Sequence, residues 1–101
     1  MQYIYFKTTS GRLMTNVDIV DAALIVHDER ISRDDYESIR EYVRTNCAGI
    51  LEEVTDEVTV EYLVQNGYKV KAIELYYDLN RENGITLSEA KKVIDQAIRQ
   101  W

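Results

Sequence analysis

The sequence contains no proline, one cysteine and four glycines in 101 residues. Because proline ends or kinks a helix, its absence leaves every helical pattern uninterrupted. The single cysteine, Cys47, excludes an intrachain disulfide and a zinc site made of several cysteines of one chain. No apolar run approaches the ~18 residues of a membrane-spanning helix, so we expect no contact with a membrane interior.

The remaining composition is typical of a globular protein, with 46% apolar and 30% charged residues. A chain of this length can bury roughly 65% of its surface, which is enough for one domain over residues 1–101. The opening residues lack a basic segment followed by an apolar one, so they do not match a secretory signal. Together with the lone thiol, this favours a cytoplasmic location.

Charge is distributed unevenly along the chain, which has a net charge of −6. Residues 51–68 contain five acidic side chains and no basic one, whereas residues 69–101 contain five acids and six bases. An acidic chain repels phosphate, so nucleic-acid binding is disfavoured. The acidic stretch is interpreted as a solvated face or as a surface for a basic partner.

The local patterns predict a mainly α fold, with a short N-terminal β-hairpin followed by about five helices in one compact domain. Aromatic and β-branched residues around a Ser10-Gly11 turn predict the hairpin over residues 2–14. Apolar spacing and capping residues predict helical segments over residues 16–27, 33–47, 50–57, 59–66, 69–83 and 87–100. Residues 50–57 also fit a strand by propensity, and the short helix is the interpretation taken.

Three helix starts have recognisable capping residues. Thr15 or Asn16 can cap the helix over 16–27, and Ser32 with Asp35 forms a variant of the capping box. Thr86 and Glu89 form a complete capping box at the start of the last helix.

Residues 63–95 share a series of residues with a known helical hairpin. The matching residues are Gly67, Lys69-Val70, Ala72-Ile73, Gly84-Ile85, Leu87, Glu89-Ala90-Lys91 and Asp95. In this order they resemble the helical part of the C-terminal domain of the bacterial ribosomal stalk protein. The resemblance covers about a third of the chain, and it implies a helical hairpin that binds protein partners.

In the stalk family, aliphatic and basic side chains of this hairpin recruit translational GTPases. The matching partner-binding positions are Lys69, Val70, Ile73 and Lys91. The chain departs from the family at Glu74, where the family has a basic residue, and its first helix is about one turn longer. Because a reversed charge discourages the same partner, the resemblance implies a protein-binding hairpin and not GTPase recruitment.

Residues 78–89 also resemble a twelve-residue EF-hand calcium loop. Oxygen donors stand at the ligand positions Asp78, Asn80, Glu82, Thr86 and Glu89. The glycine expected at position six is displaced by one residue, since Asn83 stands there and Gly84 follows. The alternative interpretation of the same residues is a helix stop followed by a capping box.

The chain has no pattern typical of catalysis. Phosphate-binding glycine loops and nucleophile-elbow motifs are absent, and the only histidine, His27, would have to pair with Cys47. The sequence therefore predicts a small non-enzymatic protein-interaction module, either a monomer or a homodimer, with an unknown protein partner and no cofactor. The alternative is a calcium-binding protein using Asp78, Asn80, Glu82 and Glu89.

Overall fold

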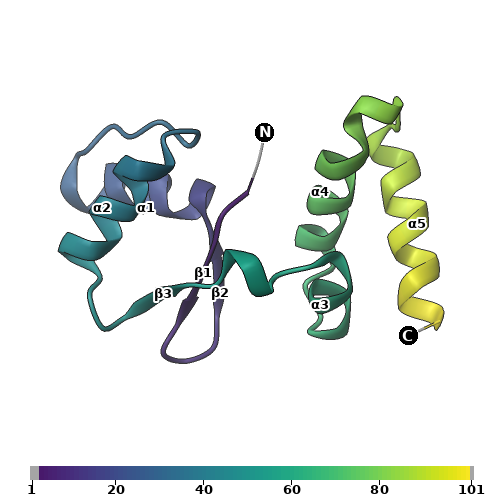
Figure 1. The fold of residues 1–101 in the computed structure, drawn as a ribbon, viewed down its shortest axis with the longest axis horizontal. Helices are drawn as coiled ribbons and strands as arrows, with labels where there is room; N and C mark the ends of the chain where they lie inside the picture. Colours follow the sequence, from purple (N-terminus) through teal and green to yellow (C-terminus); the bar gives the residue numbers. More distant parts are fainter. Residues whose placement is uncertain (1–2, 101) are drawn as a thin grey trace. The chain divides into compact units, whose positions relative to one another are not determined.

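A computed structural model describes residues 3–100 of the chain. Within that range the protein is mainly α, with five α-helices and a three-stranded antiparallel sheet near the N-terminus (Figure 1). Where the sequence predicts one domain, the chain divides into two compact units, residues 1–55 and residues 56–101. We call them the N-terminal unit and the C-terminal unit.

The N-terminal unit combines the sheet with two helices. Its elements are β1 (Tyr5–Thr8), β2 (Leu13–Thr15), α1 (Asn16–His27), α2 (Tyr36–Asn46) and β3 (Leu51–Glu53). The strands lie in the order β2-β1-β3, and β1 is antiparallel to both neighbours. The core consists of apolar side chains from the sheet and both helices, with Ile4, Phe6, Ile19, Ala23, Ile39, Tyr42 and Val43 buried.

The predicted hairpin and the first predicted helix are both present. In the hairpin, Phe6 pairs with Met14, and Gly11 adopts a φ of 88° in the turn, a region that favours glycine. Gln2, where the predicted hairpin begins, lies outside the described residues. Helix α1 has the predicted bounds, because Thr15 and Asp18 form a capping box at its start.

Helix α2 begins three residues later than the sequence predicts. Asp35, interpreted as the acid of a capping box, is itself the cap: its carboxylate accepts hydrogen bonds from the N–H and the hydroxyl of Ser38. Ser32 instead closes a turn before the helix, where its carbonyl accepts from the N–H of Asp35. The prediction of a helix from residue 33 was therefore wrong over its first turn.

The helix predicted over residues 50–57 is wrong. Residues 51–53 form strand β3 beside β1, with Lys7 opposite Glu52, and a 3₁₀ turn follows over Thr55–Glu57. The N–H of Val54 donates to the carbonyl of Tyr5, and the hydroxyl of Thr55 accepts from the N–H of Tyr5. These bonds join residues about fifty positions apart, so the local pattern of apolar residues does not predict them.

One polar side chain is fully enclosed in the N-terminal unit. Asn16 has 0% of its surface exposed. Its amide oxygen accepts from the N–H of Ile4 at 3.2 Å, and its amide nitrogen donates to the carbonyl of Arg33 at 2.7 Å. The side chain thus fixes the residue before β1 and the loop before α2 to the first turn of α1. Burial of an amide is tolerated because both of its ends are hydrogen-bonded.

A bidentate ion pair connects α2 to strand β3. The guanidinium of Arg40 donates to both carboxylate oxygens of Glu53, at 2.7 and 3.1 Å, and also to Glu37. The hydrogen bonds from Arg40 hold the pKa of the Glu53 carboxyl below its ordinary value, although partial burial opposes this shift. Glu53 is therefore ionised at neutral pH and helps to hold the third strand against the helix.

The C-terminal unit consists of three helices whose buried residues include alanines and large aliphatic side chains. Its elements are α3 (Val60–Gln65), α4 (Lys69–Asn80), a 3₁₀ turn (Arg81–Asn83) and α5 (Leu87–Gln100). Ala72 of α4 and Ala90 of α5 are fully buried, as is Leu63 of α3. The small alanines let α4 and α5 approach each other, so the two helices form an antiparallel hairpin (Figure 1). The helix predicted over 87–100 is present with the predicted bounds, and those predicted over 59–66 and 69–83 are present with slightly trimmed ends.

We expect the substitution Asn16→Ala to lower the free energy of unfolding of the N-terminal unit by about 3 kcal/mol. The change leaves the buried N–H of Ile4 without its partner and also removes the part-buried bond to the carbonyl of Arg33; an unsatisfied buried group costs about 1–3 kcal/mol. Urea unfolding followed by circular dichroism measures the loss. Asn46→Ala is the matched control, since Asn46 is exposed and donates only to the carbonyl of Tyr42. Equal losses for both variants would contradict the role of Asn16.

We expect Arg40→Gln to destabilise the protein by about 1 kcal/mol at neutral pH and by much less in acid. The folded-state pKa of Glu53 is lowered, so its stabilising effect is complete above the unfolded-state pKa and disappears as pH falls through the folded-state pKa. Urea unfolding of both proteins at neutral pH and well below the pKa of Glu53 measures the difference. Arg44→Gln, which removes only an exposed pair with Glu41, is the control.

Candidate protein-binding groove

The α4–α5 hairpin forms a groove of about 410 Å³ on its surface. The groove is lined by Val70, Ile73 and Glu74 of α4 and by Leu87, Ser88 and Lys91 of α5. Three of the four predicted partner-binding residues, Val70, Ile73 and Lys91, are therefore brought together. They come from two helices about twenty residues apart in the sequence, and the antiparallel packing of those helices places them side by side.

The walls of the groove are apolar side chains that the fold leaves in solvent. Val70 is 66% exposed and Leu87 is 57% exposed, whereas Ile73 is half-buried. An exposed valine contributes little to the core of the unit, because little of its surface leaves water on folding. Val70 and Leu87 are therefore available for contact with another molecule, and Ile73 supports both the fold and the groove floor.

Part of the groove was not predicted from the sequence. Glu74 departs from the stalk pattern and was not expected in the site, and Leu87 and Ser88 were expected only as the start of a helix. The available signal was helical spacing, since Leu87 lies four residues before Lys91 and therefore on the same face of α5. Glu74 and Lys91 give the groove one acid on one helix and one base on the other.

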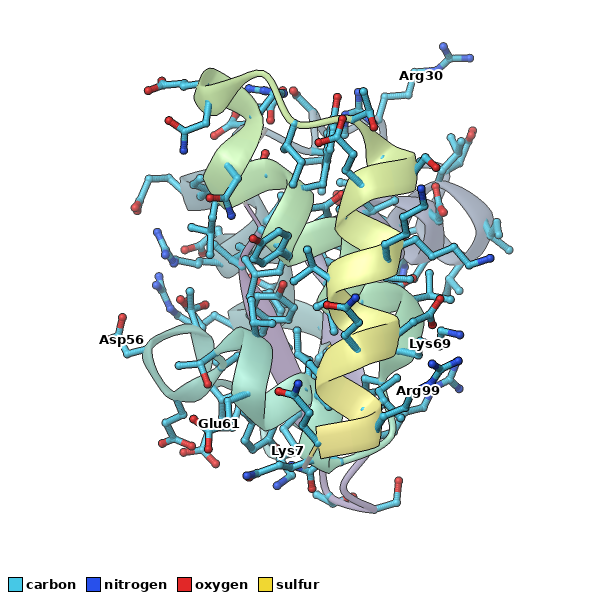
Figure 2. The ribbon with its side chains drawn as sticks, turned by 90° about the vertical axis from the view of Figure 1, so that its right-hand side faces the viewer. Lys7, Arg30, Asp56, Glu61, Lys69 and Arg99 are labelled. Carbon is cyan, nitrogen blue, oxygen red and sulfur yellow. The ribbon has the colours of Figure 1, made fainter. Side chains whose placement is uncertain are left out.

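The fourth predicted residue, Lys69, lies elsewhere on the hairpin. Its ammonium nitrogen is 2.7 Å from a carboxylate oxygen of Asp95 on α5. Figure 2 shows Lys69 and Arg99 on the same side of α5. The hydrogen bond from Lys69 is the main cause of a lowered pKa of Asp95, and the charges of Lys91 and Arg99 add to it. Lys69 therefore joins the first turn of α4 to α5 and does not line the groove.

The residues of the proposed calcium loop are held in helical structure. Asp78 and Asn80 lie in the last turn of α4, Glu82 lies in the 3₁₀ turn, and Glu89 lies in the first turn of α5. The amide of Asn80 donates to the carbonyl of Tyr76, and the N–H of Glu89 donates to the hydroxyl of Thr86.

Within residues 3–100, no three His, Cys, Asp or Glu side chains are grouped so that they could hold a metal ion. The structure therefore adds no support to the calcium interpretation, which stays a prediction from the sequence.

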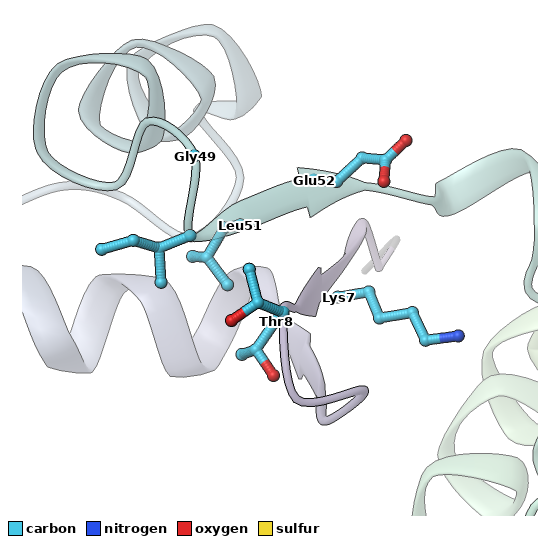
Figure 3. Close-up of a pocket in the computed structure, with 7 residues that line it drawn as sticks. Lys7, Thr8, Gly49, Leu51 and Glu52 are labelled. Carbon is cyan, nitrogen blue, oxygen red and sulfur yellow. The ribbon is translucent and has the colours of Figure 1, made fainter.

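A second, smaller pocket lies in the N-terminal unit (Figure 3). It has a volume of about 260 Å³ and is lined by Lys7, Thr8, Thr9, Gly49, Ile50, Leu51 and Glu52, where β1 meets the start of β3. The hydroxyl of Thr8 is already bonded to Ser10 and to the N–H of Arg12. The Lys7 and Glu52 positions pair across the two strands. This pocket belongs to the edge of the sheet and brings no reactive pair of side chains together.

Cys47 and His27 are both neighbours of Tyr42. The rings of His27 and Tyr42 meet edge-on, with their centroids 5.6 Å apart. Burial raises the pKa of the Cys47 thiol. Burial is also the main cause of the raised pKa of Tyr42, with smaller effects from Cys47 and Glu29. A raised thiol pKa disfavours the thiolate that a nucleophilic cysteine requires.

In comparisons with protein-family models, with curated proteins and with solved structures, nothing matches this chain. The resemblance of residues 63–95 to the stalk hairpin thus rests on the residues quoted for it. Among the described helices, none has the length and apolar character needed to cross a membrane.

We expect Lys69→Met to raise the pKa of the Asp95 carboxyl toward its ordinary value, because the hydrogen bond from Lys69 is the main cause of the lowered pKa. A carbon-detected NMR titration of the side-chain carboxyl measures it. Lys71→Met is the matched control, since the ammonium of Lys71 lies over the ring of Tyr68 instead. An unchanged Asp95 pKa in Lys69→Met would show that the ion pair does not form in solution.

Proposed function

We propose that this protein is a small, non-enzymatic protein-interaction module that binds a protein partner through the α4–α5 groove. The observation that carries the proposal is the exposure of Val70 and Leu87 on the walls of a single groove. Exposed apolar side chains that line a concave surface are typical of protein-binding sites.

The size of the groove suits a few anchoring side chains of a partner. Fully burying a valine or leucine side chain contributes about 1.5–3 kcal/mol, so covering the exposed parts of Val70 and Leu87 contributes about 1–2 kcal/mol each. Such a gain supports binding only when a partner fills the groove with apolar anchors of its own. An apolar helix face, with anchors three or four residues apart, matches a groove that runs between two helices.

The charges beside the groove favour one orientation of a bound partner. Glu74 lies on the α4 wall and Lys91 on the α5 wall. A partner with a basic residue toward α4 and an acidic residue toward α5 is favoured over one with the reverse arrangement. The stalk-like positions support a protein partner, and the acidic Glu74 argues for a partner other than a translational GTPase.

We expect Val70→Asp to weaken partner binding at least tenfold without unfolding the protein. The added carboxylate would be buried against an apolar anchor of the partner, and that burial is costly. Val70 is already largely in water in the free protein, so stability should change little. The measurement is affinity capture of the partner from source-cell extract, followed by calorimetric titration of the purified partner.

Leu79→Asp is a closely matched control. Leu79 is also on α4 and is also 66% exposed, but it is nine residues from Val70 and therefore about half a turn around the helix. Both variants should keep the circular dichroism spectrum of the native protein. If both lose the partner equally, or neither does, the groove is not the binding site.

A further inference from the structure

The last turn of helix α1 carries exposed apolar side chains. Leu24 and Ile25 are 45% and 81% exposed and lie on the side of the helix away from the buried Ile19 and Ala23. Val26, which is 68% exposed, lies seven residues after Ile19 and extends the buried stripe beyond the core. Helix α1 is therefore apolar on both faces, although the fold covers only one of them.

The charges around this apolar surface are mainly of one sign. Helix α1 contains Asp18 and Asp21 and no lysine or arginine. Asp21 lies three and four residues before Leu24 and Ile25, which places it beside them on the same face. Asp28 and Glu29 follow at the other end of the helix, where the helix dipole is also negative. The apolar surface is thus bounded by carboxylates at both ends.

This arrangement argues against a second copy of the chain as the occupant. An antiparallel two-fold pairing centred between Leu24 and Ile25 places Asp21 opposite Asp28 of the other copy, and does so twice. A parallel pairing places Asp21 opposite Asp21. Either contact brings like charges together in a surface that is losing water, which is unfavourable. Anionic lipid surfaces are repelled by the same carboxylates.

We propose that the exposed face of α1 is a second docking surface, which takes a basic amphipathic segment of a partner protein. Apolar side chains of that segment cover Leu24 and Ile25, while its lysines or arginines pair with Asp21 and Asp28. The site is in the N-terminal unit and does not depend on the groove of the C-terminal unit. The net charge of −6 also speeds the approach of a basic partner.

The test uses the full chain, labelled with ¹⁵N, and a synthetic helical peptide as the probe. The peptide has leucines at helical spacing on one face and lysines on the other, and a second peptide has glutamates in place of the lysines. We expect the lysine peptide to cause saturable amide shifts at residues 21–28, and the glutamate peptide to cause none. Selective shifts confined to the acidic residues 52–61 would overturn the proposal.

Three variants separate the apolar and charged contributions. Ile25→Ser and the double variant Asp21→Asn/Asp28→Asn should each weaken binding of the lysine peptide at least tenfold. Asparagine is chosen because Asp28 has a φ of 52°, a conformation that asparagine also tolerates. Leu79→Ser, on the C-terminal unit, should bind as the wild type does, since Leu79 has an exposure close to that of Val26. Equal weakening in Leu79→Ser would overturn the proposal.

Sedimentation equilibrium tests whether a second copy of the chain covers the exposed face of α1 instead. A monomer over the whole concentration range agrees with the proposal. Self-association that Ile25→Ser abolishes would overturn it in favour of a second copy. The groove proposal survives either result, because its test depends on Val70 and not on α1.

Discussion

The buried side chain of Asn16 is the interaction on which the N-terminal unit depends. It connects the residue before β1, the first turn of α1 and the loop that leads to α2. Because the backbone groups that it binds belong to distant segments, α1 is oriented by a specific hydrogen-bonding pattern as well as by its apolar face. That orientation places Ile19 and Ala23 in the core and leaves Leu24 and Ile25 in solvent. The proposed docking surface on α1 is thus a consequence of how the helix is anchored.

In the C-terminal unit, small buried residues determine how closely two of the helices pack. Ala72 and Ala90 let α4 and α5 come close, and the larger apolar side chains at their edges cannot all be covered by three short helices. Val70 and Leu87 remain outside and form the groove. Lys69 and Asp95 reinforce the same hairpin through an ion pair. Stability and the proposed recognition are therefore divided between neighbouring residues of the hairpin: Lys69 pairs with Asp95, whereas Val70 lines the groove.

The two proposed surfaces differ in the partner that each favours. The groove combines apolar walls with one acid and one base, which suits an oriented helix with mixed charge. The face of α1 combines a more exposed apolar patch with acids at both ends, which suits a basic segment. Each surface belongs to one unit, so each can be altered without the other.

The sequence by itself determined those helices and turns that depend only on residues close together in the chain. The capping box at Thr15, the hydroxyl of Thr86 and the helical spacing of apolar residues predicted α1, α3, α4 and α5, and the turn at Gly11 predicted the hairpin. The stalk-like residues predicted Lys69, Val70, Ile73 and Lys91 as one site. The packing of α4 against α5 brings Glu74 and Leu87 into the groove beside Val70, Ile73 and Lys91, and it pairs Lys69 with Asp95 instead. Strand β3 was missed because its hydrogen bonds run to β1, far away in the sequence. The exposure of Val70 and Ile25 was decided by tertiary structure alone, since a periodic pattern marks a side chain as apolar and only the packed neighbours determine whether it is covered.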